Sequence, residues 1–261
     1  MIEAASRPSD IFEQRGARAA LLATTAEAAA EPLEFARVMF KAQAEIAARI
    51  PESLTGHLAD DVDALLPIVR PLLRVAAAHG PEQLALEADK RAHEDPETAR
   101  TRLIVYWRGD APDDFLARAM LQPYAETLRV RNIAPDRVHA RGHCPFCGGG
   151  AWISARKSAP DAESGFRYLG CSLCGTEWNF NRGRCPSCFE EDPHKLPVFQ
   201  SDAHPLVRIE ACETCRRYVK SIDLAKDARP VPIVDDLVSI AMDLWAVDEG
   251  FTRIEPGLAG L

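Results

Sequence analysis

The stretch Arg141-Gly-His-Cys-Pro-Phe-Cys147 recurs as Arg182-Gly-Arg-Cys-Pro-Ser-Cys188, 41 positions further along the chain. The same offset relates the Arg-x-x-x-Cys-x-x-Cys run that begins at Arg167 to the run that begins at Arg208. Each copy of the repeat therefore reads Cys-x2-Cys-x23-Cys-x2-Cys. Two Cys-x-x-Cys turns joined by a long excursion are typical of rubredoxin-like or zinc-ribbon knuckles, in which four thiolates hold one tetrahedral metal ion.

The repeat predicts two metal sites with four cysteine ligands each. The first would use Cys144, Cys147, Cys171 and Cys174, and the second Cys185, Cys188, Cys212 and Cys215. An alternative pairs Cys144/Cys147 with Cys212/Cys215. The sequential pairing is favoured because each copy then closes its own shorter loop. Four sulfur ligands suit iron and zinc alike, so both metals stay open at this point.

Other uses of the eight cysteines fit the pattern less well. Disulfide frameworks belong mainly to short secreted domains, and the first residues lack the basic and apolar regions of a signal peptide. A redox Cys-x-x-Cys pair would explain one pair but not four in register. Cysteine ligands fit a reducing, cytoplasmic location. His143, His194 and His204 lie near cysteines, but four sulfurs already fill each site.

The two copies differ at the residue that follows each Cys-x-x-Cys pair. Gly148 and Gly175 stand there in the first copy, whereas Phe189 and Arg216 stand there in the second. Glycine adopts positive φ without steric cost and lets the turn wrap so that backbone N–H groups point at sulfur. The second site is therefore expected to be more strained or more open to solvent, and to hold its metal less tightly.

Before the repeat, apolar residues at helical spacing and well-placed prolines predict an all-helical region. Phe35, Val38, Met39, Ala42, Ile46 and Ile50 follow the helical period between Pro32 and Pro51. Further helices are expected over 62–78, kinked or divided at Pro67 and Pro71, and over 81–91, 96–107 and 115–128, the last bent at Pro123. The histidines of this region, His57, His79 and His93, have no ligand-spaced partner and are expected to be surface or capping residues.

These patterns predict an α+β multidomain protein in four parts. A helical subdomain spans 1–140, two rubredoxin-like subdomains span 141–181 and 182–222, and a C-terminal helix and tail span 223–261. Short strands are expected around the knuckles, at 151–155 and 176–180, where side chains alternate. No stretch is long and apolar enough to span a membrane.

One strong helix is expected near the C-terminus. Val234, Leu237, Ile240, Ala241, Leu244 and Trp245 would share its apolar face, with Pro232 in the first turn and Gly250 at the end. Asp235, Asp236 and Asp243 would lie on its solvated face rather than form a carboxylate site.

Three stretches carry a resemblance to a known family. They are Arg167-Tyr-Leu-Gly-Cys-Ser-Leu-Cys-Gly-Thr-Glu-Trp178 followed by Arg182, then Arg208-Ile-Glu-Ala-Cys-Glu-Thr-Cys-Arg-Arg-Tyr-Val-Lys220, and finally Asp235-Asp-Leu, Met-Asp-Leu-Trp245 and Gly250-Phe251-x-Arg253. Together they resemble the FdhE family of formate dehydrogenase accessory proteins. The resemblance covers the last half of the chain with distinctive motifs and the helical part only in general pattern.

The resemblance implies a helical subdomain followed by two rubredoxin-like subdomains that bind two iron ions rather than zinc. It also implies a cytoplasmic, non-enzymatic protein that acts on the catalytic molybdopterin subunit of a respiratory formate dehydrogenase and is needed for its activity. Trp178, Arg182, Arg216 and Tyr218 lie beside the knuckles and are of types that often anchor interfaces. They are candidate partner contacts; the alternative is that they only pack around the knuckles.

Two other functions remain open at the level of sequence. A rubredoxin-like iron site can transfer one electron, and the glycine-bearing first copy is the better candidate for it. Zinc ribbons also bind nucleic acid, but the net charge of −8 argues against that function, because nucleic-acid binding favours a clustered basic face. No residue is predicted to be catalytic.

Overall fold

The computed structural model describes residues 7–159 and 162–260. The chain divides into two compact units, one made of Met1–Leu21 with Leu33–Val138 and the other of Leu22–Pro32 with His139–Leu261. The main boundary after Val138 lies close to the end of the expected helical region, whereas the assignment of 22–32 to the second unit was not predicted. No helix among the described residues combines the length and the apolar character needed to cross a membrane.

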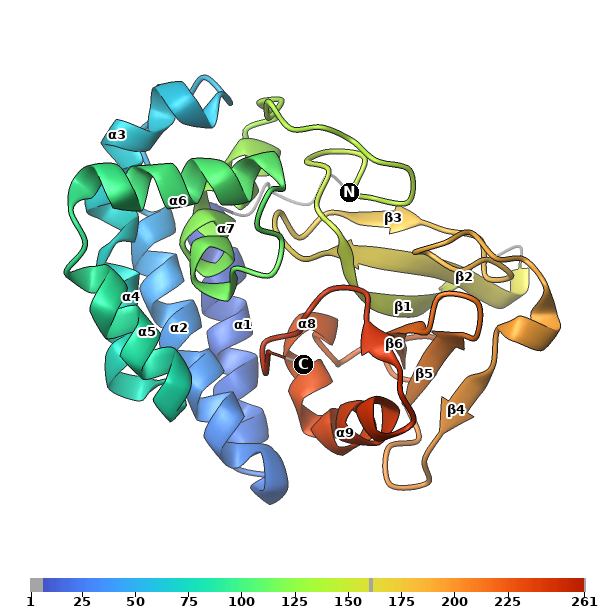
Figure 1. The fold of residues 1–261 in the computed structure, drawn as a ribbon. Coiled ribbons are helices and arrows are strands. Elements are labelled where there is room, and N and C mark those ends of the chain that lie inside the picture. The colour runs from blue at the N-terminus through green and yellow to red at the C-terminus, as the bar shows by residue number, and fades with distance from the viewer. Residues whose placement is uncertain (1–6, 160–161, 261) are drawn as a thin grey trace. The chain divides into compact units, whose positions relative to one another are not determined.

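The first unit is helical, as Figure 1 shows. Its helices are α1 (Pro8–Ala23), α2 (Ala30–Ala47), α3 (Leu58–Val69), α4 (Pro71–His79), α5 (Glu82–Ala92), α6 (Pro96–Arg108) and α7 (Phe115–Val130). A short 3-10 turn, η1 (Glu27–Ala29), precedes α2 and lies in the segment assigned to the second unit. The expected division of the 62–78 segment is found between α3 and α4, where Pro71 opens the new helix. Proline suits that position because a first-turn residue needs no intrahelical N–H donor.

Helix α7 forms the core of this unit, since its residues from Leu116 to Leu128 are all buried. The Tyr124 hydroxyl donates to Asp61 Oδ2 at 2.7 Å, and Arg15 forms a buried ion pair with Glu126. Helix α1, which supplies Arg15, was not predicted. Its buried side chains include only two apolar ones, Phe12 and Ala19, which is too sparse a pattern to give a helical period.

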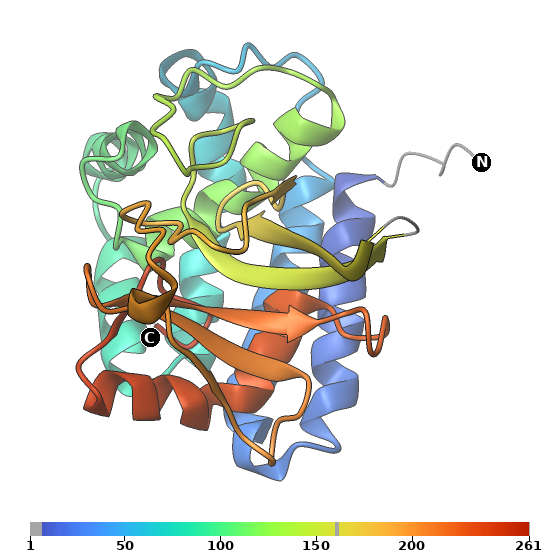
Figure 2. The same cartoon turned by 90° about the vertical axis from the view of Figure 1, so that its right-hand side faces the viewer.

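The second unit contains one seven-stranded sheet, and its longer strands are visible in Figure 2. Along the sheet the order is β3-β2-β1-β6-β5-β4, and β7 pairs with β6 beside this path. The strands are β1 (Ala151–Ala159), β2 (Ala162–Cys171), β3 (Glu177–Asn179), β4 (Val198–Gln200), β5 (Val207–Cys212), β6 (Arg217–Asp223) and β7 (Thr252–Arg253). A 3-10 turn, η2 (Pro193–Lys195), precedes β4.

The sequence repeat is also a repeat of strand pairing. Leu169 on β2 faces Trp178 on β3, and the residues 41 positions later, Glu210 on β5 and Val219 on β6, face each other in the same way. The copies meet where β1 pairs in parallel with β6, from Ile153 opposite Lys220 onward. The two copies therefore share one continuous sheet, which the sequence did not predict.

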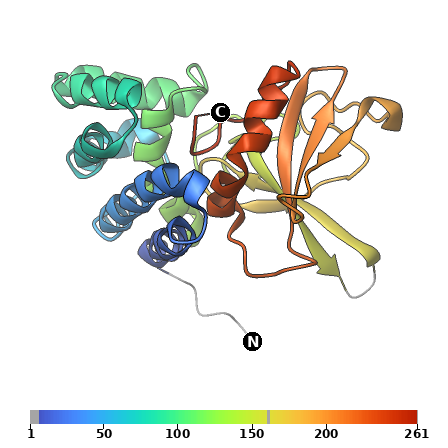
Figure 3. The same ribbon diagram turned by 90° about the horizontal axis from the view of Figure 1, so that it is seen from below.

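The C-terminal segment covers one face of this sheet, as the view in Figure 3 shows. It forms α8 (Pro232–Asp235), the 3-10 helix η3 (Asp236–Ser239) and α9 (Ile240–Asp248) in succession. Met242 and Ala246 of α9 pack against Ile209 and Tyr218 of the strands. Gly250 ends the segment with a φ of 78°, as expected for a helix-ending glycine.

The expectation of a single helix with one apolar face was wrong. Leu244 and Trp245 are 52% and 38% exposed, and the buried positions of α9 are Met242, Asp243 and Ala246. The interruption by η3 explains the change of face. A 3-10 helix turns about 120° per residue against about 100° for an α-helix, so four residues rotate the later positions by roughly 80°.

Candidate metal centres

The eight thiols form two clusters of four, with the sequential membership that the repeat favours. In each cluster the four Sγ atoms lie within 4.8 Å of one another. The Sγ–Sγ distances are 3.6 Å for Cys144–Cys174, 3.4 Å for Cys147–Cys171, 3.8 Å for Cys185–Cys215 and 3.6 Å for Cys188–Cys212. Metal–sulfur bonds of about 2.3 Å in tetrahedral geometry place sulfurs about 3.8 Å apart, whereas a disulfide needs about 2.05 Å. All eight cysteines are free, so these distances fit metal sites and exclude disulfides.

The chemistry of the first cluster also calls for a cation. Its four cysteines are buried, and burial is the main cause that raises the pKa of the Cys171 thiol well above its usual value. Four thiols this close cannot all ionise in a buried place unless a positive ion compensates them. The donor set suits iron and zinc alike.

The turns that present the cysteines are the same in both copies. In each first knuckle, the N–H of the first cysteine bonds to a carbonyl five residues on, and its own carbonyl accepts from the N–H four residues on. These bonds are Cys144 N to Gly149 O at 2.8 Å and Gly148 N to Cys144 O at 2.9 Å, then Cys185 N to Glu190 O at 2.9 Å and Phe189 N to Cys185 O at 3.1 Å.

The residues that follow the pairs adopt left-handed backbone in both copies, although only the first copy has glycine there. The φ angles are 67° at Gly148 and Gly175, 65° at Phe189 and 54° at Arg216. The two larger side chains make contacts of their own. The guanidinium of Arg141 lies 4.1 Å from the centre of the Phe189 ring, and Arg216 lies 3.8 Å from that of Phe251.

The clusters differ in solvent access, while backbone N–H groups contact sulfur in both. In the second cluster Cys188 is exposed and Cys215 is partly exposed. In the first, the backbone N–H groups of Leu173 and Cys174 each donate to Cys171 Sγ at 3.4 Å. His143 Nδ1 lies 3.0 Å from Gly148 O, so this histidine contacts the backbone of the knuckle.

The four candidate partner contacts lie in different surroundings. Trp178 is partly buried on β3, and Arg182 and Arg216 are exposed. Tyr218 is fully buried, and its hydroxyl donates to Asp243 Oδ1 at 2.8 Å. Its inclusion among the surface candidates was therefore wrong, because strand alternation turns this ring into the core under α9.

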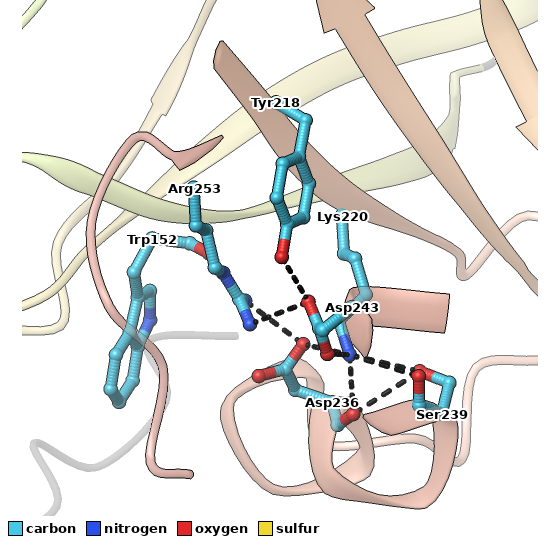
Figure 4. Close-up of polar contacts among 7 residues, drawn as sticks. All are labelled: Trp152, Tyr218, Lys220, Asp236, Ser239, Asp243 and Arg253. Atoms are coloured by element: carbon cyan, nitrogen blue, oxygen red, sulfur yellow. Dashed lines mark hydrogen bonds and ion pairs between the residues drawn. The ribbon is translucent and has the colours of Figure 1, made fainter. Parts of the chain in front are cut away.

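A buried ion network, shown in Figure 4, joins the strands to the C-terminal helices. It contains two cations, Lys220 and Arg253, and two carboxylates, Asp236 and Asp243. Lys220 Nζ lies 2.9 Å from Asp236 Oδ1 and also bonds to Asp243, while Arg253 Nη2 lies 2.9 Å from Asp236 Oδ1. Arg253 also donates to the carbonyl of Trp152 at 2.8 Å.

This network overturns the expectation that the aspartates of the C-terminal helix are solvated. Asp235 is 9% exposed, Asp236 5% and Asp243 2%. Burial alone would raise the pKa of Asp236, but the charges of Arg253 and Lys220 hold it below its ordinary value. Burial raises the pKa of Asp243. Lys220 lies within a run of five buried residues of β6, 218–222, and the mixed polar and apolar sequence of this strand does not reveal that burial.

Two family models match the second unit. The model described as "FdhE, central domain" matches residues 143–182, and "FdhE, C-terminal domain" matches 184–258. The crystal structure of the FdhE protein from Pseudomonas aeruginosa superimposes with a TM-score of 0.73 at 22% identity, over 96% of this chain and 95% of that one. The structural likeness shows that the fold is shared.

Curated relatives agree with these matches. A protein named "Protein FdhE homolog" from Aquifex aeolicus is 29% identical over 203 residues, which cover 77% of this chain and 71% of the relative. One of the same name from Haemophilus influenzae is 38% identical over 112 residues, which cover 42% of this chain but only 36% of the relative. The expectation drawn from the cysteine-rich motifs is confirmed: this chain contains matches to both FdhE domain models, and its similarity to an FdhE homolog extends over 77% of its length.

Proposed function

We propose that this chain is a cytoplasmic accessory protein that binds the catalytic subunit of a respiratory formate dehydrogenase and is needed for that enzyme to become active. The observation that carries the proposal is the pair of four-cysteine clusters in a unit matched by both FdhE family models. A site with four protein ligands keeps no open position for a substrate. We therefore assign the clusters a structural and redox-responsive role, and propose no catalytic activity for this chain.

In this proposal the clusters hold two iron ions, and zinc is the alternative. Both copies are too small to fold around an apolar core of their own, so metal–sulfur bonds supply the folding free energy around each knuckle. A visible absorption spectrum of protein purified without oxygen and then oxidised tests the metal. A ferric iron–sulfur chromophore supports iron, whereas a colourless protein with two zinc ions per chain assigns zinc.

The contact surface proposed for the partner includes Trp178, Arg182 and Arg216. Their side chains are at least partly accessible and lie near the knuckles. Aromatic and arginine side chains are the types that most often dominate binding energy. Replacing Trp178 and Arg182 together by Ala is expected to weaken binding, while replacing the exposed Arg229, paired with Asp227, is a matched control.

The experiment combines binding with activity in cells. Tagged chain is used to capture the dehydrogenase catalytic subunit, and dehydrogenase activity is measured in cells that lack the chain and are complemented with wild type, the Trp178→Ala/Arg182→Ala double variant or Arg229→Ala. We expect capture and activity with wild type and Arg229→Ala, and loss with the double variant. Absence of capture by wild type, together with full activity in the deleted cells, would reject the accessory role.

One observation favours a second function, one-electron transfer. Cys188 of the second cluster is exposed, so a partner can approach this metal more closely than the buried first one. Hydrogen bonding and solvent exposure both tune the potential of such centres. This function requires a reversible one-electron redox couple that is lost in Cys188→Ser. It also requires a reducing partner that transfers its electron to this metal site.

A further inference from the structure

A small pocket lies beside the second cysteine cluster, at the junction of the two repeat copies. Its volume is about 70 Å³. Its walls combine the first knuckle of the second copy, through Cys185 and Pro186, with the strands β4 and β5 and with Ile254. Space of this size exceeds what one water needs, which is about 10–15 Å³, and it suffices for a group of a few heavy atoms.

The pocket concentrates positive charge. Glu210 is the one carboxylate among its lining residues. Five arginines line the pocket: Arg167, Arg182, Arg184, Arg208 and Arg217. Arg184 is compensated from outside by Glu191, to which its Nε donates at 2.6 Å. A metal centre with four thiolates would add one or two negative charges nearby, which still leaves an excess of positive charge. This concentration contrasts with the net charge of −8 of the chain.

The innermost arginine is held in place by the protein itself. Arg167 is 3% exposed, and its side chain donates to Ser154 Oγ and to the carbonyls of Asn181 and Arg184, at 3.1–3.2 Å. Its Nη2 lies 2.6 Å from Glu210 Oε2. These contacts use the donors of Arg167 and fix Glu210 at the base of the pocket.

Two of the outer arginines, Arg208 and Arg217, keep donors for a ligand. Arg208 directs Nε and Nη2 to Glu210 Oε1, and no described contact uses its Nη1. Arg217 is exposed, and its guanidinium makes no contact among the described residues. The single carboxylate of Glu210 thus pairs with both Arg167 and Arg208, which leaves one positive charge uncompensated. Arg217 adds another positive charge to the accessible part of the pocket.

We propose that this pocket binds a phosphate group, either inorganic phosphate or the phosphate monoester of a small molecule. Planar guanidinium groups bind phosphate oxygens through paired hydrogen bonds. A tetrahedral dianion carries twice the charge of a carboxylate and has more oxygens, so it can neutralise the positive charge that Glu210 leaves uncompensated. The proposal does not rest on the proposed accessory function, although Arg182 belongs to both surfaces, and phosphate binding is measured without the partner.

Calorimetric titration of the metal-loaded protein at constant ionic strength tests the site. The probes are inorganic phosphate, glycerol phosphate, acetate and a short single-stranded oligonucleotide. Arg182→Ala/Arg217→Ala removes two charges from the rim, and Arg229→Ala removes one charge elsewhere in the same unit. Metal content and circular dichroism are measured for each variant to show that the clusters and the fold persist.

We expect saturable binding of phosphate, weakened about tenfold or more in the double variant and within twofold of wild type in Arg229→Ala. Tighter binding of glycerol phosphate would identify a monoester as the natural ligand, and equal or weaker binding would identify inorganic phosphate. If acetate binds as well as phosphate, if only the oligonucleotide binds, or if Arg229→Ala weakens binding as much as the double variant does, the proposal is wrong. A double variant that loses its metal is replaced by Arg217→Ala alone, which must show the same selective loss.

Discussion

Phe189 and Arg216 occupy backbone conformations that favour glycine, yet each has a large side chain. Left-handed backbone costs roughly 1–2 kcal/mol for a residue with a Cβ atom. The contacts of Phe189 with Arg141 and of Arg216 with Phe251 and the carbonyl of Glu249 offset part of that cost. In the second copy, side-chain contacts around the metal site therefore compensate in part for two unfavourable backbone conformations.

This exchange can be measured at Phe189. Both Phe189→Ala and Phe189→Gly remove the ring, but only glycine also relieves the left-handed backbone. We expect Phe189→Gly to be more stable than Phe189→Ala by about 1 kcal/mol, as measured by denaturant unfolding of the metal-loaded protein. Gly148→Ala in the first copy should lower the free energy of unfolding by about the same amount relative to wild type. Equal stabilities of the two Phe189 variants would contradict the strain.

The buried network predicts a large effect at Lys220. Replacing it by Met leaves Asp236 and Asp243 with one cation for two carboxylates. Breaking a buried ion pair in this way destabilises by about 3–5 kcal/mol, and we expect that loss in denaturant unfolding. Lys226→Met, at an exposed position, should stay within about 0.5 kcal/mol of wild type. A similar small change in Lys220→Met would mean that the network adds little to stability.

At the scale of elements, the knuckles of the two copies share hydrogen bonds and backbone angles but differ in exposure. Cys188 is open to solvent, whereas all four cysteines of the first cluster are buried. A chelator reaches an exposed ligand first. We therefore expect graded chelation to remove the metal of the second cluster before that of the first. The metal content per chain is measured at each chelator concentration, and the Cys144→Ser and Cys188→Ser variants, each lacking a ligand of one cluster, show which metal is lost. Earlier loss of the first metal would reverse the expectation.

The elements also show what the sequence can and cannot predict. Pro81 and Pro96 placed the starts of α5 and α6, and the cysteine register placed the knuckles, because these signals act within a few residues. The pairing of β1 with β6 joins residues far apart in the chain and leaves no local signal. The same holds for Lys220 with Asp236 and Arg253, and for the rotation that η3 introduces before α9.

At the scale of the whole molecule, the two units should respond differently to the loss of metal. Replacing Cys171 and Cys174 by Ser removes the first cluster. We expect the helical signal in far-ultraviolet circular dichroism to persist, because α7 has a buried core of its own. The second cluster should bind its metal more weakly, because β1 supports β6 in the shared sheet.

Metal content per chain and the circular dichroism spectrum check both parts. Cys212→Ser with Cys215→Ser is the matched variant in the other copy. Loss of most of the helical signal would contradict the independence of the helical unit, and an unchanged second site would contradict support through the sheet.

The order β3-β2-β1-β6-β5-β4 places the copies head to tail, since β1 of one copy meets β6, the counterpart of β3, of the other. A head-to-tail contact leaves one unused half at each end of the sheet, where a further copy could add. In this chain the contact between the two copies is intramolecular. The outermost strands, β3 and β4, are only three residues long, and edges this short discourage the addition of a third copy.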